Sequence, residues 1–319
     1  MQSVALVFGC TGQDGSYLCK SLLAKDFQVF GTTRKKNKPN LKRLITLGIA
    51  DKIQIVSCDL EDFNQTKNTI DTFQPNEIYT LSAQSSVGDS FKKPVETQKS
   101  IVNTTLNILE VCREIKFEGN LFFAGSSEIF GSTDTPAVVD TKIDLRSPYA
   151  TAKYQSFLLS KMYREIYKIN CVTGILFNHE SPLRDERFVM KKIINTAIKI
   201  KKGITKELLV GNILIKRDWG YAEEYVEAMQ LINRSKTKKD YIICSGESYR
   251  LQDVIEIVFS QLGLNWKDYV KSSQALLRKS EIEISEGNPG EIYNDLGWKS
   301  VTDIKKLINI LIKYELKEN

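Results

Sequence analysis

The first half of the chain alternates short runs of β-branched and aromatic residues with longer segments whose apolar residues recur every three or four positions. The short runs predict strands at residues 4–8, 28–32, 53–57, 77–81, 121–124 and 171–177. The longer segments predict helices at residues 15–24, 64–73, 95–113 and 149–167. Successive strands joined through a helix form right-handed crossovers and lie parallel. The alternation therefore predicts an α/β fold with a doubly wound parallel sheet.

The alternation of strand-like and helix-like segments becomes less regular after residue 177. Helices are predicted at residues 188–202, 222–232, 251–262 and 301–314, with short strands near Leu208 and Tyr241. A chain of 319 residues has room for about two domains. The second half therefore predicts a smaller C-terminal lobe that binds a ligand beside the sheet.

Composition excludes several classes of protein. No apolar run approaches the roughly 20 residues that cross a bilayer, so no membrane segment is expected. The net charge of +6 is spread along the chain, which suits anionic ligands and gives no argument for nucleic acid. The six cysteines form no C-x-x-C pair and His179 is the only histidine, so no metal site is expected. The amino terminus lacks the features of a signal peptide, which predicts a cytoplasmic protein.

Three glycines, Gly9, Gly12 and Gly15, follow the first predicted strand and open the first predicted helix. Glycines at this spacing permit a tight turn and close approach to a pyrophosphate, and the helix N-terminus favours negative charge. The motif predicts a Rossmann-type dinucleotide site. Its predicted cofactor-binding residues are Gly9, Thr11, Gly12, Gln13, Asp14 and Gly15.

The end of the second predicted strand indicates which dinucleotide binds. A site that prefers NAD usually has an acid there for the ribose 2′-hydroxyl, whereas this chain has Arg34 and no nearby carboxylate. An arginine can bind a 2′-phosphate through two hydrogen bonds, so the sequence predicts NADP. Asp59 and Leu60, which follow the third strand, are expected to meet the adenine.

A proton-transfer pair is predicted where the helix at residues 149–167 begins. Tyr149 and Lys153 are four residues apart and share one helix face, so the lysine ammonium is expected to lower the tyrosine pKa. The preceding strand ends in residues 125–128, which include Ser126 and Glu128. Because ligands bind at the carboxyl ends of parallel strands, these four side chains are predicted to form one site.

The glycine motif, the serine after this strand and the Tyr-x-x-x-Lys pair together resemble the extended short-chain dehydrogenase/reductase family. The resemblance covers essentially the whole chain and narrows to the GDP-mannose 4,6-dehydratases. The stretches that carry it are residues 11–18, 77–79, 83–85, 147–149, 174–182, 216–220 and 225–229.

The resemblance implies a catalytic group of Ser126, Glu128, Tyr149 and Lys153. It implies oxidation of the sugar at C4 with Tyr149 as the base, loss of water across C5 and C6 with Glu128 and Ser126, and return of the hydride to C6. It adds Leu81, Ala83, Tyr149 and Lys153 to the residues expected to bind NADP. The substrate-binding residues that it implies are Ser85, Ser126, Asn178, Lys192, Gly211, Arg217, Arg278 and Glu281.

The expected division is an NADP-binding Rossmann domain at residues 1–178, to which 217–245 return, and a nucleotide-sugar-binding lobe at 179–216 and 246–319. The segment after Arg34 is shorter than in the family, and residues 183–187 differ from the family's usual sequence. The first departure leaves both a homodimer and a homotetramer open. The second leaves the substrate open between GDP-mannose and a related GDP-sugar such as a GDP-heptose. Two alternatives are an NADPH-dependent GDP-4-keto-6-deoxysugar reductase or epimerase, and a non-catalytic NADP-binding sensor.

Overall fold

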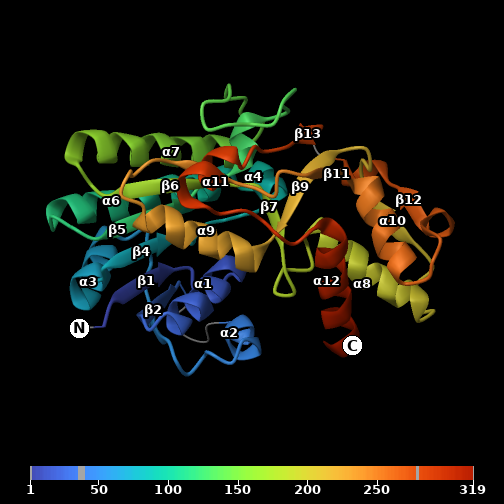
Figure 1. The fold of residues 1–319 in the computed structure, drawn as a ribbon, viewed down its shortest axis with the longest axis horizontal. Coiled ribbons are helices and arrows are strands. Elements are labelled where there is room, and N and C mark those ends of the chain that lie inside the picture. Colours follow the sequence, from blue (N-terminus) through green and yellow to red (C-terminus); the bar gives the residue numbers. More distant parts are fainter. Residues whose placement is uncertain (1, 35–39, 278–279, 319) are drawn as a thin grey trace.

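In the computed structural model, which describes residues 2–34, 40–277 and 280–318, the centre of the molecule is a seven-stranded parallel sheet (Figure 1). Its order is β10-β6-β5-β4-β1-β2-β3. The strands are β1 Val4–Phe8, β2 Gln28–Thr33, β3 Gln54–Ser57, β4 Glu77–Thr80, β5 Asn120–Ala124, β6 Cys171–Leu176 and β10 Tyr241–Ile243. The predicted doubly wound fold is confirmed, because the order reverses between β1 and β4.

Alternate residues of the strands point to opposite faces of this sheet. Ala5 and Val7 enter the core under one face, which also contains Leu18 of α1 and Val226 of α9. Leu6 and Phe8 enter the core on the other side, which is covered by α3, α6 and α7. These helices are α1 Gln13–Ala24, α3 Phe63–Phe73, α6 Thr104–Glu114, α7 Pro148–Tyr167 and α9 Ala222–Arg234.

The helix predicted at residues 95–113 is continuous in direction but not in type. It consists of α5 Pro94–Gln98, a π-helical segment η1 Lys99–Asn103 and then α6. The Ile101 carbonyl accepts hydrogen bonds from Thr104, Thr105 and Ser156 hydroxyls. Side-chain hydroxyls that compete for a helix carbonyl in this way favour a local change in helix geometry.

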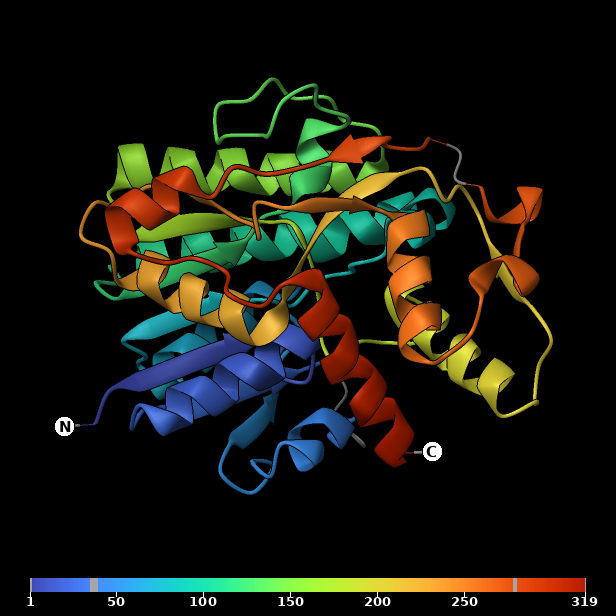
Figure 2. The same ribbon diagram turned by 45° about the vertical axis from the view of Figure 1, so that its right-hand side comes forward.

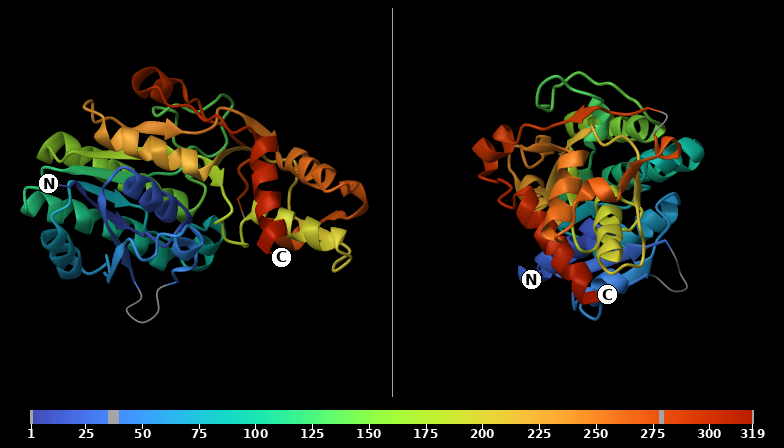
Figure 3. Two further views of the ribbon diagram at one scale, coloured as in Figure 1. Left: turned by 60° about the horizontal axis from the view of Figure 1, so that its bottom comes forward. Right: turned by 90° about the vertical axis from the view of Figure 1, so that its right-hand side faces the viewer.

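A second core lies beyond one end of the sheet (Figures 2 and 3). It is enclosed by α8 Val189–Lys201, α10 Leu251–Gln261 and α12 Ile304–Glu318, with β8 Leu208–Val210 paired to β12 Val270–Ser272. A smaller sheet joins it to the central sheet and contains β7 Asn178–Glu180, β9 Lys216–Tyr221, β11 Ser248–Arg250 and β13 Ile284–Ser285. Within the described ranges, no helix is long and apolar enough to cross a membrane.

The remaining elements are short and lie in the connections. They are α2 Lys42–Thr46, α4 Val87–Lys92, α11 Gly290–Leu296 and the 3-10 turns η2 Ser127–Phe130, η3 Trp266–Asp268 and η4 Gln274–Leu276. Two of these elements matter for the site. The turn η2 carries Glu128, and α2 carries Arg43.

Candidate active site

A cleft of about 540 Å³ extends from the carboxyl ends of β4, β5 and β6 into the second lobe. This volume suits a small-molecule ligand. All four predicted catalytic residues line the cleft, and so do the predicted residues Asp14, Leu81, Ala83, Ser85, Asn178, Lys192, Gly211, Arg217 and Glu281. Arg278 lies outside the described residues. The structure thus brings side chains from both halves of the chain into one site.

The glycine turn between β1 and α1 fits a dinucleotide pyrophosphate. Gly9 has φ +89°, and a Cβ there would lie 2.8 Å from the backbone nitrogen of Ser82. A Cβ on Gly15 would lie 2.2 Å from the Gly9 carbonyl oxygen. Gly12 precedes the first helical residue without a side chain to cap it. The first-turn N–H groups of α1 are thus presented to an anion at the carboxyl edge of the sheet.

The side chains of Gln13 and Asp14, both predicted to bind the cofactor, contact another part of the chain. Ser181 donates to Gln13 Oε1 at 2.8 Å, and Asp14 Oδ2 lies 2.9 Å from Nε2 of His179. Although burial opposes both charges, their attraction lowers the pKa of Asp14 to about 2 and raises that of His179. Asp14 and His179 therefore form a largely buried hydrogen-bonded pair, and the side chain of Gln13 is engaged by Ser181.

The predicted adenosine contacts lie at the ends of β2 and β3. Arg34 directly follows β2 and is exposed. Asp59 follows β3, and its carboxylate accepts a hydrogen bond of 3.1 Å from the Glu61 amide. Leu60 is 2% exposed and belongs to the core beneath the sheet, so its side chain faces away from a cofactor.

Helix α7 positions the tyrosine and the lysine. Ser147 caps the helix by accepting a hydrogen bond from the Ala150 amide at 3.0 Å, and Pro148 occupies the first turn. Tyr149 therefore stands at the helix N-terminus, with Lys153 one turn further on. On the facing turn η2, the Glu128 amide donates to the Ser126 hydroxyl at 3.3 Å.

The prediction that Lys153 lowers the pKa of Tyr149 is wrong for the chain alone. Burial raises the pKa of Tyr149 to about 12, an effect that a hydrogen bond with Ser126 only partly offsets and that the nearby charge of Glu128 reinforces. Lys153 Nζ lies 5.8 Å from the centre of the tyrosine ring and donates to the Ala124 carbonyl at 2.7 Å. Desolvation therefore has a larger effect on the pKa of the Tyr149 phenol than the Lys153 ammonium has.

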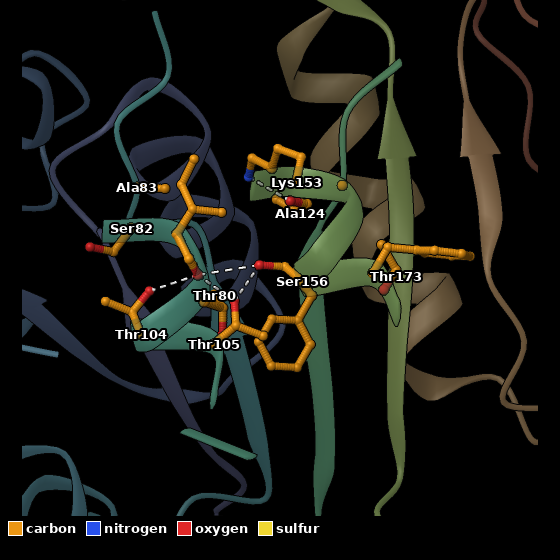
Figure 4. A pocket seen from close by; sticks show the side chains of 13 residues that line it. Thr80, Ser82, Ala83, Thr104, Thr105, Ala124, Lys153, Ser156 and Thr173 are labelled. Atoms are coloured by element: carbon orange, nitrogen blue, oxygen red, sulfur yellow. Dashed lines mark hydrogen bonds between the residues drawn. The ribbon is translucent and has the colours of Figure 1, made fainter. Parts of the chain in front are cut away.

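Figure 4 shows the small cavity, about 20 Å³, next to Lys153. Hydroxyls from β4, β6, α6 and α7 line it, and Thr105 donates to Ser156 across the helix contact at 3.0 Å. The lysine is enclosed by protein on this side, while its ammonium is held at the end of β5. This enclosure explains why burial lowers the pKa of Lys153 to about 8.

The cationic residues predicted for the substrate are fixed by backbone carbonyls. Arg217 is 4% exposed, donates to the Lys216 carbonyl at 2.9 Å and contacts Glu281 at 3.3 Å. Lys192 donates to the Leu209 carbonyl at 2.8 Å. Both side chains line the cleft, where a diphosphate needs donors.

Among the cleft residues that sequence reasoning missed are two arginines, Arg184 and Arg187. The guanidinium carbon of Arg184 lies 3.6 Å from the ring centre of Phe188, and Nε lies 3.5 Å from Glu180. Both arginines lie within five residues after the stretch at residues 174–182 that carried the resemblance. Their position in the sequence could have identified them, since arginines clustered beside an anion site suggest further contacts to the ligand.

This fold and cleft define an enzyme of the extended short-chain dehydrogenase/reductase class that binds a nicotinamide dinucleotide. A family model described as GDP-mannose 4,6 dehydratase matches residues 6–311. A similar protein is GDP-mannose 4,6 dehydratase 2 of Arabidopsis thaliana, 36% identical over 99% of this chain and 87% of the relative. The Vibrio cholerae GDP-mannose 4,6-dehydratase is 32% identical over 99% and 94% of the two chains.

Solved structures show the same fold. The Bacillus anthracis dTDP-glucose 4,6-dehydratase in complex with NAD has a TM-score of 0.86 at 17% identity, covering 99% of this chain and 97% of that one. RMD from Pseudomonas aeruginosa, complexed with NADPH, has a TM-score of 0.83 at 19% identity, covering 100% and 99%. The chain belongs to the GDP-mannose 4,6-dehydratase family, whose members are nucleotide-sugar hydro-lyases. The predictions of family, enzyme class and nicotinamide cofactor are confirmed.

Proposed function

We propose that this dehydratase acts on GDP-mannose, or on a related GDP-sugar such as a GDP-heptose, with NADP as its cofactor. The observation that supports the proposal is that Ser126, Glu128, Tyr149 and Lys153 line one cleft. The same cleft continues to Arg217 of β9 and Lys192 of α8, so a sugar at the acid and base groups leaves its diphosphate near fixed cations.

The four catalytic side chains divide the proton transfers of the proposed reaction. Tyr149 accepts the proton of the sugar C4 hydroxyl, and the charge of Lys153 stabilises the phenolate. The bound nicotinamide ring supplies the hydride acceptor at C4 and later the hydride donor at C6. The C4 carbonyl acidifies the C5 proton, which Glu128 removes. Glu128 and Ser126 then protonate the C6 hydroxyl, which leaves as water. Return of the hydride to C6 requires a proton at C5, which Glu128 relays from solvent, and Tyr149 releases the C4 hydroxyl proton to solvent, so the cofactor shows no net change.

The test of the proposed function is incubation with GDP-mannose and catalytic NADP+, followed by NMR of the sugar. The expected result is loss of the C6 hydroxymethyl group and appearance of a methyl doublet, without net NADPH formation. Stoichiometric consumption of NADPH with a 4-keto-6-deoxy substrate would instead support the reductase alternative. Absence of turnover with GDP-mannose, GDP-heptoses and GDP-N-acetylglucosamine, despite NADP binding, would favour the sensor.

The proposed NADP preference depends on Arg34. Replacing Arg34 with alanine is expected to weaken NADP+ binding by about 10- to 100-fold, the loss expected for charge-assisted hydrogen bonds to one group. NAD+ lacks the 2′-phosphate, so its affinity is expected to change less than about twofold. Titration calorimetry measures the affinities of the wild type and the variant for NADP+ and for NAD+. Arg250→Ala, an exposed arginine before α10, is the control. Equal losses for both dinucleotides in Arg34→Ala would contradict the assignment.

Three further parts of the proposal concern the whole molecule. The proposed division gives residues 1–178 and 217–245 to cofactor binding, and 179–216 and 246–319 to the nucleotide-sugar.

We propose a homodimer through α5, α6 and α7, with a homotetramer as the alternative, and light scattering distinguishes the two assemblies. Exposed apolar side chains on these helices support the contact, namely Val95, Leu106, Leu158 and Ile166. The proposed location is the cytoplasm, which the six free buried cysteines fit.

A further inference from the structure

The segment at residues 178–187, here called the strap, contacts the start of α1 and also lines the cleft. On one side, Gln13 and Asp14 at the start of α1 bind Ser181 and His179. On the other side, Asn178 and the arginines of the strap line the cleft. A displacement of the strap would therefore alter the substrate side of the site.

Arg43 contacts both the cofactor turn and the strap, although it belongs to neither. It lies on α2, which packs beside α1 (Figure 1). Its Nε donates to the Leu183 carbonyl at 2.7 Å, and its Nη1 donates to the Thr11 carbonyl at 3.2 Å. One rigid, charged guanidinium thus joins the middle of the glycine motif to the strap.

The neighbouring carbonyl of the strap is held from the lobe. Lys191 of α8 donates to the Pro182 carbonyl at 2.8 Å and forms a buried ion pair with Glu315 of α12. Two adjacent carbonyls are therefore bound by cations from different halves of the molecule. The strap is thus held near its middle from both halves of the molecule. Lys191 binds the Pro182 carbonyl from the lobe, and Arg43 links the next carbonyl to the glycine turn, beside the contacts that Gln13 and Asp14 make with the strap.

We propose that Arg43 is a positioning residue that couples the dinucleotide turn to the strap, so that bound NADP strengthens binding of the nucleotide part of the substrate. The identity of that nucleotide rests on the proposed function. Coupling between two ligands is reciprocal, and typical values correspond to about 5- to 150-fold in affinity. Loss of Arg43 removes the link between the Thr11 and Leu183 carbonyls without removing a residue that lines the cleft, and it leaves the Gln13 and Asp14 contacts in place.

The experiment is a titration of GDP into the full chain, with and without saturating NADP+. In the wild type, GDP is expected to bind at least about fivefold more tightly when NADP+ is present. In Arg43→Met this ratio is expected to fall to below about twofold, while GDP affinity without NADP+ changes little. A purely structural role would lower the melting temperature and weaken both affinities without changing their ratio.

Two variants complete the test. Arg43→Lys keeps the charge but can reach only one of the two carbonyls well, so an intermediate ratio is expected even if Arg43→Met is unfolded. Arg234→Met is the matched control, because this half-buried arginine binds Glu77 at 2.6 Å at the amino end of β4. Its ratio is expected to equal that of the wild type.

The outcomes separate this inference from the proposed function. A wild-type ratio near one, or equal ratios in the wild type and both Arg43 variants, would overturn the coupling. Failure of GDP to bind the wild type would contradict the guanine nucleotide of the proposed function. The same titrations with UDP and dTDP would then test Arg43, with equal ratios again overturning its role.

Discussion

Replacing Tyr149 with phenylalanine is expected to lower turnover of the GDP-sugar by about 10²- to 10⁴-fold, the usual contribution of a general acid or base. The phenol is the proposed acceptor of the C4 hydroxyl proton, and without it C4 oxidation has no base. The ring is only 8% exposed, and phenylalanine preserves its packing. Binding of NADP+ and GDP is therefore expected to change little. Turnover is measured by NMR of the sugar, and binding by calorimetry.

Tyr154→Phe is the matched control for this prediction. Tyr154 lies on the same helix and stacks on Phe157 at 6.1 Å between ring centres, in a different apolar cluster. Its turnover is expected to stay within about twofold of the wild type, the usual effect of a substitution outside the chemistry. Turnover of Tyr149→Phe equal to that of Tyr154→Phe would show that the Tyr149 phenol is not the base.

Sequence periodicity predicted the central sheet closely because its strands are buried on both faces and are short, apolar runs. The predicted strand at residues 4–8 coincides with β1, and the other five differ from the structure by one residue at one end. Strand β9 gave no such signal, because it begins with Lys216, Arg217 and Asp218. Asp218 is buried because its carboxylate accepts hydrogen bonds from two backbone amides, those of Ser245 and Gly246. Such tertiary partners cannot be read from a local pattern.

The same limit applies to the site. Strand ends of a parallel sheet meet at one edge, so the sequence could place Ser126, Glu128 and Tyr149 in one cleft. It could not predict that Asp14 pairs with His179, 165 residues away, or that Arg43 binds the strap. The direction of the Tyr149 pKa shift was also predicted wrongly, because helix spacing shows the nearby lysine but not the depth of burial.

Replacing Glu128 with glutamine is expected to block loss of water while leaving NADP+ and GDP binding intact. Glutamine has the size of glutamate but cannot accept the C5 proton, so elimination is expected to slow by about 10²- to 10⁴-fold. C4 oxidation does not need this carboxylate. With enzyme and NADP+ in excess over GDP-mannose, the variant is therefore expected to accumulate NADPH absorbance, which the wild type returns to its starting value. The same reaction in deuterated water, followed by NMR, reports deuterium at C5, which only the wild type is expected to introduce.

The two observables distinguish a base at C5 from a merely structural carboxylate. A structural role would weaken ligand binding or slow C4 oxidation, and neither change would cause NADPH to accumulate. Glu118→Gln is the control, because this exposed carboxylate precedes β5 at the end opposite the site. It is expected to behave as the wild type in both measurements. Full dehydratase activity in Glu128→Gln, with deuterium at C5, would assign the proton abstraction to a different group. Accumulated NADPH without exchange at C5 would place it on Glu128, since oxidation then proceeds while the C5 proton has no acceptor.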